Sequence, residues 1–235
     1  MLQEVDLSQE TGLFYKARAG LIIKNLERRN MNGQYVQNRE EALLTVLDMI
    51  SPGAVVGRGD SVTLFELGII PAIIKRGQNR LINPFEKDDK GFFPETERRR
   101  ELQREALLSD IFLTSTNAIT LDGKLVNIDG AGNRVGAMVF GPRKVIVVAG
   151  MNKVVKNVEE GLDRIHNICT PMTAIRHRLK HGTEGCDEVP CAKTGKCPDC
   201  HHALRACSYT VIIEGAMASE KGRINVVLVG EQMGI

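Results

Sequence analysis

The cysteines near the carboxyl end of the chain are the residues whose types and spacing most clearly indicate chemistry. Five of the six cysteines fall between Cys186 and Cys207, in a polar stretch that also holds glycine and proline. Because such a stretch cannot bury five thiols in an apolar core, metal binding or redox chemistry is expected. One close pair, Cys197-Pro-Asp-Cys200, forms a turn in which two thiolates can face one ion.

Four hypotheses for these thiols stay open: a structural zinc site, an iron–sulfur cluster, a redox pair, and unligated thiols in a loop. The predicted metal ligands are Cys191, Cys197, Cys200 and Cys207, with Cys186 as the alternate. In a zinc site His201 or His202 can replace one thiol. The sixth cysteine, Cys169, follows a helical pattern beside an isoleucine and is predicted to be a small core residue.

A glycine-rich loop supplies a second kind of chemistry. Gly57 and Gly59 follow a short apolar run, and Ser61 and Thr63 come directly after them. Glycines let a backbone approach a ligand closely, and the two hydroxyls can donate to a phosphate or carboxylate. The alternative is a tight connection between strand and helix with Ser61 as the helix cap. The pattern matches neither the dinucleotide-binding fingerprint nor a P-loop.

Acidic, amide and basic side chains gather in the stretch 115–136, which follows an apolar run. The candidates there are Asn117, Asp122, Asn127, Asp129, Asn133 and Arg134. Asp122 or Asp129 could act as a general base, and Arg134 could hold an anion. Loops at the carboxyl ends of strands hold the ligands of open α/β sheets, which favours this interpretation. A hairpin turn at Asp122-Gly123 and a solvated loop remain the alternatives.

The elements that must position these loops are short apolar strands separated by helical segments. Strands are expected at 54–56, 72–74, 110–115, 144–149, 209–213 and 224–229. Continuous apolar strands that alternate with helices predict an α/β fold, with a mostly parallel sheet and helices on both faces. The last two strands are expected to complete that sheet after a cysteine-rich insertion at about 182–207.

The helices are predicted from apolar periodicity. Two of them lie at about 9–50: the first places Leu13, Ala17 and Leu21 on one face, and Asn38 caps the second. Another helix is predicted from about residue 154 to about residue 165, because Val154, Val155, Val158, Leu162 and Ile165 recur at helical spacing. A charged helix from 94 to 108 carries Arg98, Arg99, Arg100 and Arg104. These arginines could bind anions, but pairing with neighbouring glutamates on a solvated face is favoured.

The composition limits the function classes. A chain of 235 residues that is 43% hydrophobic and 26% charged is typical of a globular protein, here taken as one domain over 1–235. A net charge of +2 and an aromatic content of 4% argue against nucleic-acid binding. We expect a cytoplasmic protein, because no secretory signal is evident and no apolar run reaches the roughly 18–20 residues of a membrane span.

Three stretches together resemble a known family. Gly57-Arg-Gly-Asp-Ser-Val-Thr-Leu-Phe-Glu-Leu-Gly68, Thr116-Asn-Ala-Ile-Thr120 and Pro142-Arg-Lys-Val-Ile-Val-Val-Ala-Gly150 are similar to the LUD domain of lactate-utilisation proteins. The resemblance runs from about residue 12 to Ile235. The cysteine run is similar to a cysteine-bearing subgroup found in anaerobic bacteria.

The resemblance implies a fold like that of the ribose-5-phosphate isomerase, glucosamine-phosphate deaminase and CoA-transferase superfamily. Members bind sugar phosphates, CoA or related anions at a Gly-Ser/Thr loop and an acidic loop. By position, Gly57, Gly59, Ser61 and Thr63 match the first loop, and 117–134 occupies the second. The chain lacks the acidic end of the isomerase motif after Asp129 and has no clear CoA-transferase glutamate.

The sequence therefore predicts a LUD-domain protein of lactate or related carboxylate metabolism, which binds an anionic metabolite or cofactor and a cysteine-ligated metal. The redox setting implied by the family favours an iron–sulfur cluster over zinc, with iron–sulfur proteins of lactate oxidation as partners. One alternative is an enzyme of the sugar-phosphate or CoA class that uses Asp122 or Asp129. Another is a non-catalytic assembly or electron-transfer subunit; an oligomer is compatible with each.

Overall fold

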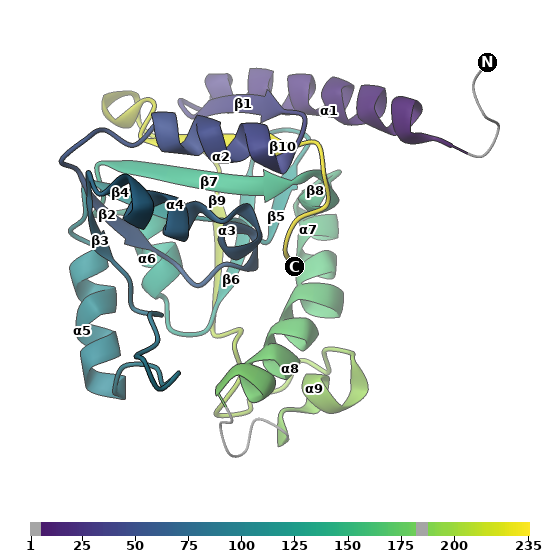
Figure 1. The fold of residues 1–235 in the computed structure, drawn as a ribbon. Helices are drawn as coiled ribbons and strands as arrows, with labels where there is room; N and C mark the ends of the chain where they lie inside the picture. The colour runs from purple at the N-terminus through teal and green to yellow at the C-terminus, as the bar shows by residue number, and fades with distance from the viewer. Residues whose placement is uncertain (1–5, 182–187) are drawn as a thin grey trace.

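A six-stranded parallel sheet forms the centre of the molecule (Figure 1). The computed structural model describes residues 6–181 and 188–235. The strands of this main sheet lie in the order β1-β10-β7-β4-β2-β3, and every neighbouring pair is parallel. Their bounds are β1 Asn32–Val36, β2 Val55–Arg58, β3 Arg80–Ile82, β4 Ile111–Thr114, β7 Lys144–Gly150 and β10 Ile224–Val229. The predicted α/β fold with a mostly parallel sheet is confirmed.

A second, four-stranded sheet was not anticipated from the sequence. Its order is β8 (Val154–Val155), β5 (Ala118–Thr120), β6 (Leu125–Asp129) and β9 (Tyr209–Ile213), and β6 runs antiparallel to both β5 and β9. The prediction that 209–213 completes the main sheet was wrong, because β9 pairs with β6 instead. Since β5 and β6 form a hairpin, much of the stretch interpreted as a loop is paired strand.

Helices cover both faces of the main sheet. The helices in the described residues are α1 Ser8–Arg28, α2 Arg39–Asp48, α3 Val62–Leu67, α4 Ile69–Arg76, α5 Thr96–Ala106, α6 Asn133–Val139, α7 Val158–Arg164, α8 Thr170–His181 and α9 Pro190–Thr194, with short helical turns η1 Met151–Lys153 and η4 Ala218–Glu220. Of these, α7 packs on the second sheet, and α9 packs on α8. A π-helical turn, η2 (Ile165–Cys169), joins α7 to α8, so that the three form one rod that descends from the sheets toward α9 (Figure 1).

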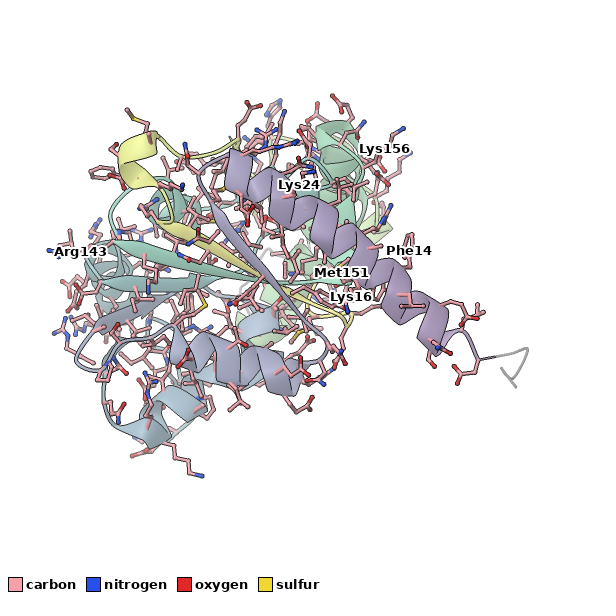
Figure 2. The ribbon with its side chains drawn as sticks, turned by 90° about the horizontal axis from the view of Figure 1, so that it is seen from above. Phe14, Lys16, Lys24, Arg143, Met151 and Lys156 are labelled. Carbon is pink, nitrogen blue, oxygen red and sulfur yellow. The ribbon has the colours of Figure 1, made fainter. Side chains whose placement is uncertain are left out.

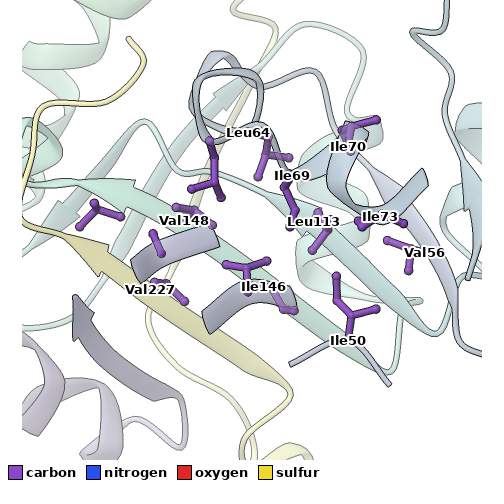
Figure 3. Packing of buried hydrophobic residues seen from close by; sticks show 14 of the residues in the cluster. Ile50, Val56, Leu64, Ile69, Ile70, Ile73, Leu113, Ile146, Val148 and Val227 are labelled. Atoms are coloured by element: carbon purple, nitrogen blue, oxygen red, sulfur yellow. The ribbon is translucent and has the colours of Figure 1, made fainter. Parts of the chain in front are cut away.

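The strand β7 shows how the side chains divide between the two faces. Ile146 and Val148 point into a core shared with α2, α3 and α4, part of which Figure 3 shows. Val145 and Val147 point the opposite way, into a core shared with α1 and the second sheet. Each fully buried aliphatic side chain of this kind contributes about 1.5–3 kcal/mol. Burial on both faces explains why the main strands are continuously apolar in sequence.

Two expected elements have a different structure. Residues 72–74 were predicted as a strand but lie in the helix α4, which Gly68 and Gly77 bound with positive φ values of 70° and 63°. Ile69, Ile70 and Ile73 are buried at helical spacing, so the short apolar run is one face of a helix. Residues 154–155 were predicted to be helical, and they form the strand β8.

The amino-terminal helix buries a different face from the expected one. Ala19, Ile22 and Leu26 are buried, whereas Leu13 is 63% exposed and Leu21 is 48% exposed. The first half of α1, which carries Phe14, extends beyond the sheets (Figure 2). An apolar stripe on an isolated helix therefore did not identify the face that packs. None of the described helices is both long and apolar enough to cross a bilayer.

Candidate functional site

A cavity of about 810 Å³ opens at the carboxyl ends of β2, β4 and β7. The segments that follow these strands contribute Ser61, Ser115 and Lys153 to its wall. The helices α5 and α8, which descend on either side in Figure 1, supply further side chains. This is the edge at which ligands bind in open parallel sheets, because the loops there converge on a crevice.

Lys153 is the most unusual side chain in this wall, and the sequence analysis missed it. It is only 3% exposed, and its Nζ lies 2.9 Å from Thr63 Oγ1 and 2.9 Å from Ser115 Oγ. Burial, reinforced by the charge of Arg164, lowers the pKa of Lys153 from 10.5 to about 7. The available signal was its position just after a continuous apolar strand, since β7 ends only three residues earlier.

The glycine-rich loop divides between cavity wall and packing. Ser61 lines the cavity, and its hydroxyl also accepts a hydrogen bond from Leu64 N at 3.3 Å, so it caps α3 as the alternative interpretation held. A Cβ at Gly57 would lie 2.8 Å from Ser109 Oγ and 3.0 Å from the carbonyl oxygen of Ala106. Gly57 therefore permits the close approach of the α5 end to β2.

Gly59 and Thr63 lie behind the wall. Gly59 is buried, and a Cβ there would lie 3.4 Å from Arg134 Cγ, an approach that the arginine side chain can adjust. Thr63 is fully buried and contacts the cavity through Lys153. Of the four loop residues predicted to bind a ligand, only Ser61 lines the cavity. Gly57, Gly59 and Thr63 pack behind the residues that do.

Arg134 joins the segments after β4 and β6. Its Nη1 donates to the carbonyl oxygen of Ser115 (3.1 Å) and to Asn127 Oδ1 (2.8 Å). Its Nη2 donates to Asn117 Oδ1 (2.8 Å) and to the carbonyl oxygen of Ile128 (2.7 Å). Burial lowers the pKa of Arg134, against the attraction of a nearby carboxylate. The guanidinium thus holds the loop that carries Asn117, which also lines the cavity.

The two candidate acid/base residues lie in different places. Asp129 borders the cavity, and its carboxylate accepts hydrogen bonds from the backbone N–H groups of Ala131 (3.1 Å), Gly132 (2.8 Å) and Val135 (3.2 Å). It thereby caps the start of α6, whose first residue, Asn133, also lines the cavity.

Asp122 lies at the β5–β6 turn, away from the cavity wall. Its carboxylate contacts Arg29 at 2.8 Å and Lys124 at 3.8 Å. Partial burial would raise the pKa of Asp122, but the Thr120 hydroxyl and the two cations lower it below the ordinary value. Asn117, Asp129, Asn133 and Arg134 are therefore brought together, and Asp122 is not among them.

Positive charge from α5 and α8 faces the cavity. Arg99 and Arg100 come from α5, and Arg176 and His177 come from α8. Arg100 pairs with Glu97 at 3.5 Å. In the part of the chain that the structure describes, neither Arg99 nor Arg176 forms an ion pair with an acidic side chain. Burial, opposed by Asp60 and reinforced by neighbouring cations, lowers the pKa of His177.

An ion pair holds α8 against the glycine-rich loop. Lys180 Nζ lies 2.8 Å from Asp60 Oδ2, and the ammonium group also lies 5.5 Å from the ring centre of Phe85. Burial would raise the pKa of Asp60, but Lys180 and Arg58 lower it overall. The pair keeps α8, and with it Arg176, beside the loop.

The cysteine segment packs along the α7–α8 rod, where Cys207 contacts the cluster of Ile165 and Cys169, and Cys191 contacts Ala174. Burial raises the pKa of Cys191 and of Cys207, and the nearby thiols of Cys197 and Cys200 raise both further, so the four thiols lie near one another. The ring of His166 adds a nitrogen, with Nδ1 3.4 Å from Cys197 Sγ.

The two cysteines that are not among these four thiols are Cys169 and Cys186. Cys169 is 1% exposed, which confirms it as a core residue, and Cys186 lies outside the described residues. Within 6–181 and 188–235, no group of three or more His, Cys, Asp or Glu side chains is arranged to hold a metal ion. The metal prediction is therefore not supported by a preformed ligand set in that part of the chain.

The fold and the cavity define an α/β protein with a polar site at the carboxyl edge of a parallel sheet. Residues 20–229 match the LUD domain, and the chain belongs to this family. The crystal structure of a DUF162 family protein from Deinococcus radiodurans is similar, at 12% identity with a TM-score of 0.48, over 92% of this chain and 97% of that one. No curated protein matches the chain.

Proposed function

We propose that the cavity binds a small anionic metabolite or cofactor, held by Arg99 and Arg176. The observation that carries this proposal is the pair of partly buried guanidinium groups, which face one cavity from two helices and form no direct ion pair with an acidic side chain of the described residues. A guanidinium withdrawn from water gains most from a carboxylate or phosphate, to which it can donate two parallel hydrogen bonds.

The cavity wall also supports specific recognition of an anion. Ser61, Ser115, Thr170 and Thr173 provide hydroxyl groups around it. The volume of about 810 Å³ lies in the range of metabolite and cofactor sites, which is about 300–1,000 Å³. The cavity is therefore large enough for a ligand that is bigger than a lone phosphate ion and carries further polar groups.

The family supports a role in lactate or related carboxylate metabolism. A carboxylate metabolite has the charge that the two arginines favour, and so does a phosphate-bearing cofactor. We place the protein in the cytoplasm with iron–sulfur proteins of lactate oxidation as partners, as the family resemblance implies.

Replacing Arg99 or Arg176 with glutamine tests the anion site. Each change keeps polarity but removes the charge, so affinity is expected to fall about tenfold or more, equivalent to about 1.4 kcal/mol. The measurement is titration calorimetry of the full chain with inorganic phosphate, L-lactate and coenzyme A. Arg98→Gln is the matched control, because Arg98 lies on the same helix but pairs with Glu101 at 3.2 Å. Equal affinities of all three variants and the wild type would contradict the proposal.

The cysteine segment favours a second function, the binding of a metal. Burial and the nearby thiols of Cys197 and Cys200 raise the pKa of Cys191 and of Cys207. These four thiols and the His166 ring are the soft donors that zinc and iron–sulfur clusters take. Since the described side chains do not form a ligand set, loading requires the thiols to move together. An iron–sulfur cluster here would suit the assembly or electron-transfer alternative.

Metal analysis of anaerobically purified protein tests this second function. We expect about one metal site per chain, with visible absorbance if the metal is an iron–sulfur cluster, and loss of that metal in Cys197→Ser. Cys169→Ser is the matched control, since that thiol lies in the core. Absence of iron and zinc, with freely titrating thiols, would rule the metal out.

The enzyme alternative of the sugar-phosphate or CoA class is favoured only by the position of Asp129 at the cavity. Its carboxylate would have to release backbone hydrogen bonds to take a proton from a ligand. Turnover of such a substrate that survives replacement of both Asp122 and Asp129 would exclude the acid/base role.

A further inference from the structure

The amine of Lys153 is held in a position suited to covalent chemistry. It lines the cavity, yet it is 3% exposed and contacts two hydroxyl groups rather than a carboxylate. Three separate segments converge on it, because Thr63 belongs to α3, Ser115 follows β4 and Lys153 follows β7. Among the described residues, Lys153 has no acidic hydrogen-bond partner, so keeping its buried amine charged costs folding free energy.

The hydrogen bonds around the amine suit its neutral form. Thr63 Oγ1 donates to Ser115 Oγ at 3.3 Å, and Ser115 Oγ donates to the carbonyl oxygen of Thr116 at 3.4 Å. With their protons used in this way, both hydroxyl oxygens accept from Lys153 Nζ. A neutral amine donates two hydrogen bonds and keeps a free lone pair, whereas an ammonium group has a third N–H group that would need a third acceptor.

The surrounding charges act in the same direction. Burial is the largest influence on the pKa of Lys153, and Arg164, which repels a proton on Nζ, is the next. Cys169 and Glu66 attract a proton and Arg134 repels one, so these smaller effects partly offset one another. With a pKa of about 7, half of the amine is unprotonated at neutral pH. Desolvation and neighbouring cations are the means by which proteins convert a lysine into a nucleophile.

We propose that Lys153 Nζ forms an imine with an aldehyde or ketone whose carboxylate or phosphate is held in the same cavity. The inference rests on the proposed anion site, which would fix the ligand while the amine attacks its carbonyl carbon. It narrows the ligand class from any small anion to an anionic carbonyl compound.

The chemical step needs no oxidant or second reactant. The Nζ lone pair bonds to the carbonyl carbon, and one proton moves from the nitrogen to the carbonyl oxygen to give a neutral carbinolamine. The C–O bond then breaks, and that oxygen leaves as water with a second proton. A protonated C=N bond to Lys153 remains. The hydroxyls of Thr63 and Ser115 lie within reach of the nitrogen and can pass protons to the leaving oxygen.

Reductive trapping tests the proposal on the intact wild-type chain. Glyoxylate serves as the carboxylate aldehyde and pyridoxal 5′-phosphate as the phosphate aldehyde, each with sodium cyanoborohydride at pH 7. Peptide mass mapping then locates the secondary amine. We expect Lys153 to be modified at least tenfold faster than Lys144, a matched control whose Nζ is bound to the Met49 carbonyl oxygen at 3.1 Å. The preferred aldehyde distinguishes a carboxylate ligand from a phosphate ligand.

Competition separates this inference from the anion site itself. Glycolate and inorganic phosphate are anions that lack an aldehyde or ketone group. They should therefore compete for the anion site and slow trapping at Lys153 without reacting with the amine. Modification spread evenly over exposed lysines, with Lys153 untouched by both aldehydes, would overturn the inference. If glycolate or phosphate still bound through Arg99 and Arg176 in that case, the anion site would stand alone. If neither anion bound, the proposed function would fail as well.

Discussion

Replacing Arg134 with methionine is expected to lower the free energy of unfolding by about 3–5 kcal/mol, since a buried, hydrogen-bonded cation is removed from its partners. Methionine fills a similar volume but donates no hydrogen bond. Two carbonyl oxygens and two amide oxygens would each lose a bond to the guanidinium. Asp129, whose side chain is 7% exposed, would lose its ion-pair partner at 3.6 Å.

Urea denaturation of the purified variant measures this loss. Arg134→Lys is expected to be intermediate, because an ammonium group keeps the charge but cannot reach partners in two directions as a guanidinium does. Arg104→Met, on the exposed face of α5, should change stability by less than about 0.5 kcal/mol. An Arg134→Met protein as stable as the wild type would show that the observed hydrogen bonds do not hold the two loops together.

Four strands of the main sheet, β2, β4, β7 and β10, were predicted because an apolar run in the local sequence marks each of them. The two edge strands, β1 and β3, were not predicted. In 145–149 every side chain is apolar, and only a strand buried on both faces uses such a run over so few residues. The cap at Asn38 was equally local, and its side chain accepts from Glu41 N at 2.9 Å as expected.

The second sheet and the helix α4 could not be predicted because both depend on distant partners. The strand β6 pairs with β9, which lies about 80 residues further along the chain, and nothing near 125–129 reveals that pairing. The run at 72–74 suits a strand or one buried helix face equally well, and contact with α2 decides for the helix.

Some residues of the candidate site could likewise be predicted from the local sequence, whereas others are identified only by the fold. The loops that contain Ser61 and Asn117 were found, because polar residues that follow apolar strands tend to meet at one edge of the sheet. Arg99 lies on a helix whose charged face was interpreted as solvated, and no role was predicted for Arg176. Only the fold shows that the two arginines line the same cavity. Lys153 carried no sequence motif at all.

Replacing Lys153 with methionine is expected to remove a large pH dependence of stability. The pKa of Lys153 in the folded protein is about 7, below the ordinary 10.5, so between these values the unfolded chain holds a proton that the folded chain has released. Wild-type stability should therefore rise with pH across this window, by up to about 1.4 kcal/mol per pH unit from this one residue. Below pH 7 both states are protonated, and the cost of burying the charge is fully present.

Urea unfolding at pH 7 and pH 9 measures this dependence as a difference between proteins. Groups other than Lys153 titrate alike in both, so they cancel when the variant is compared with the wild type. The wild type should gain about 2 kcal/mol relative to Lys153→Met over these two pH units. Lys144→Met, a change at a lysine outside the cavity, should show no such trend. Parallel pH profiles for the wild type and Lys153→Met would mean that the buried amine keeps an ordinary pKa, which would also remove the electrostatic basis for its nucleophilic role.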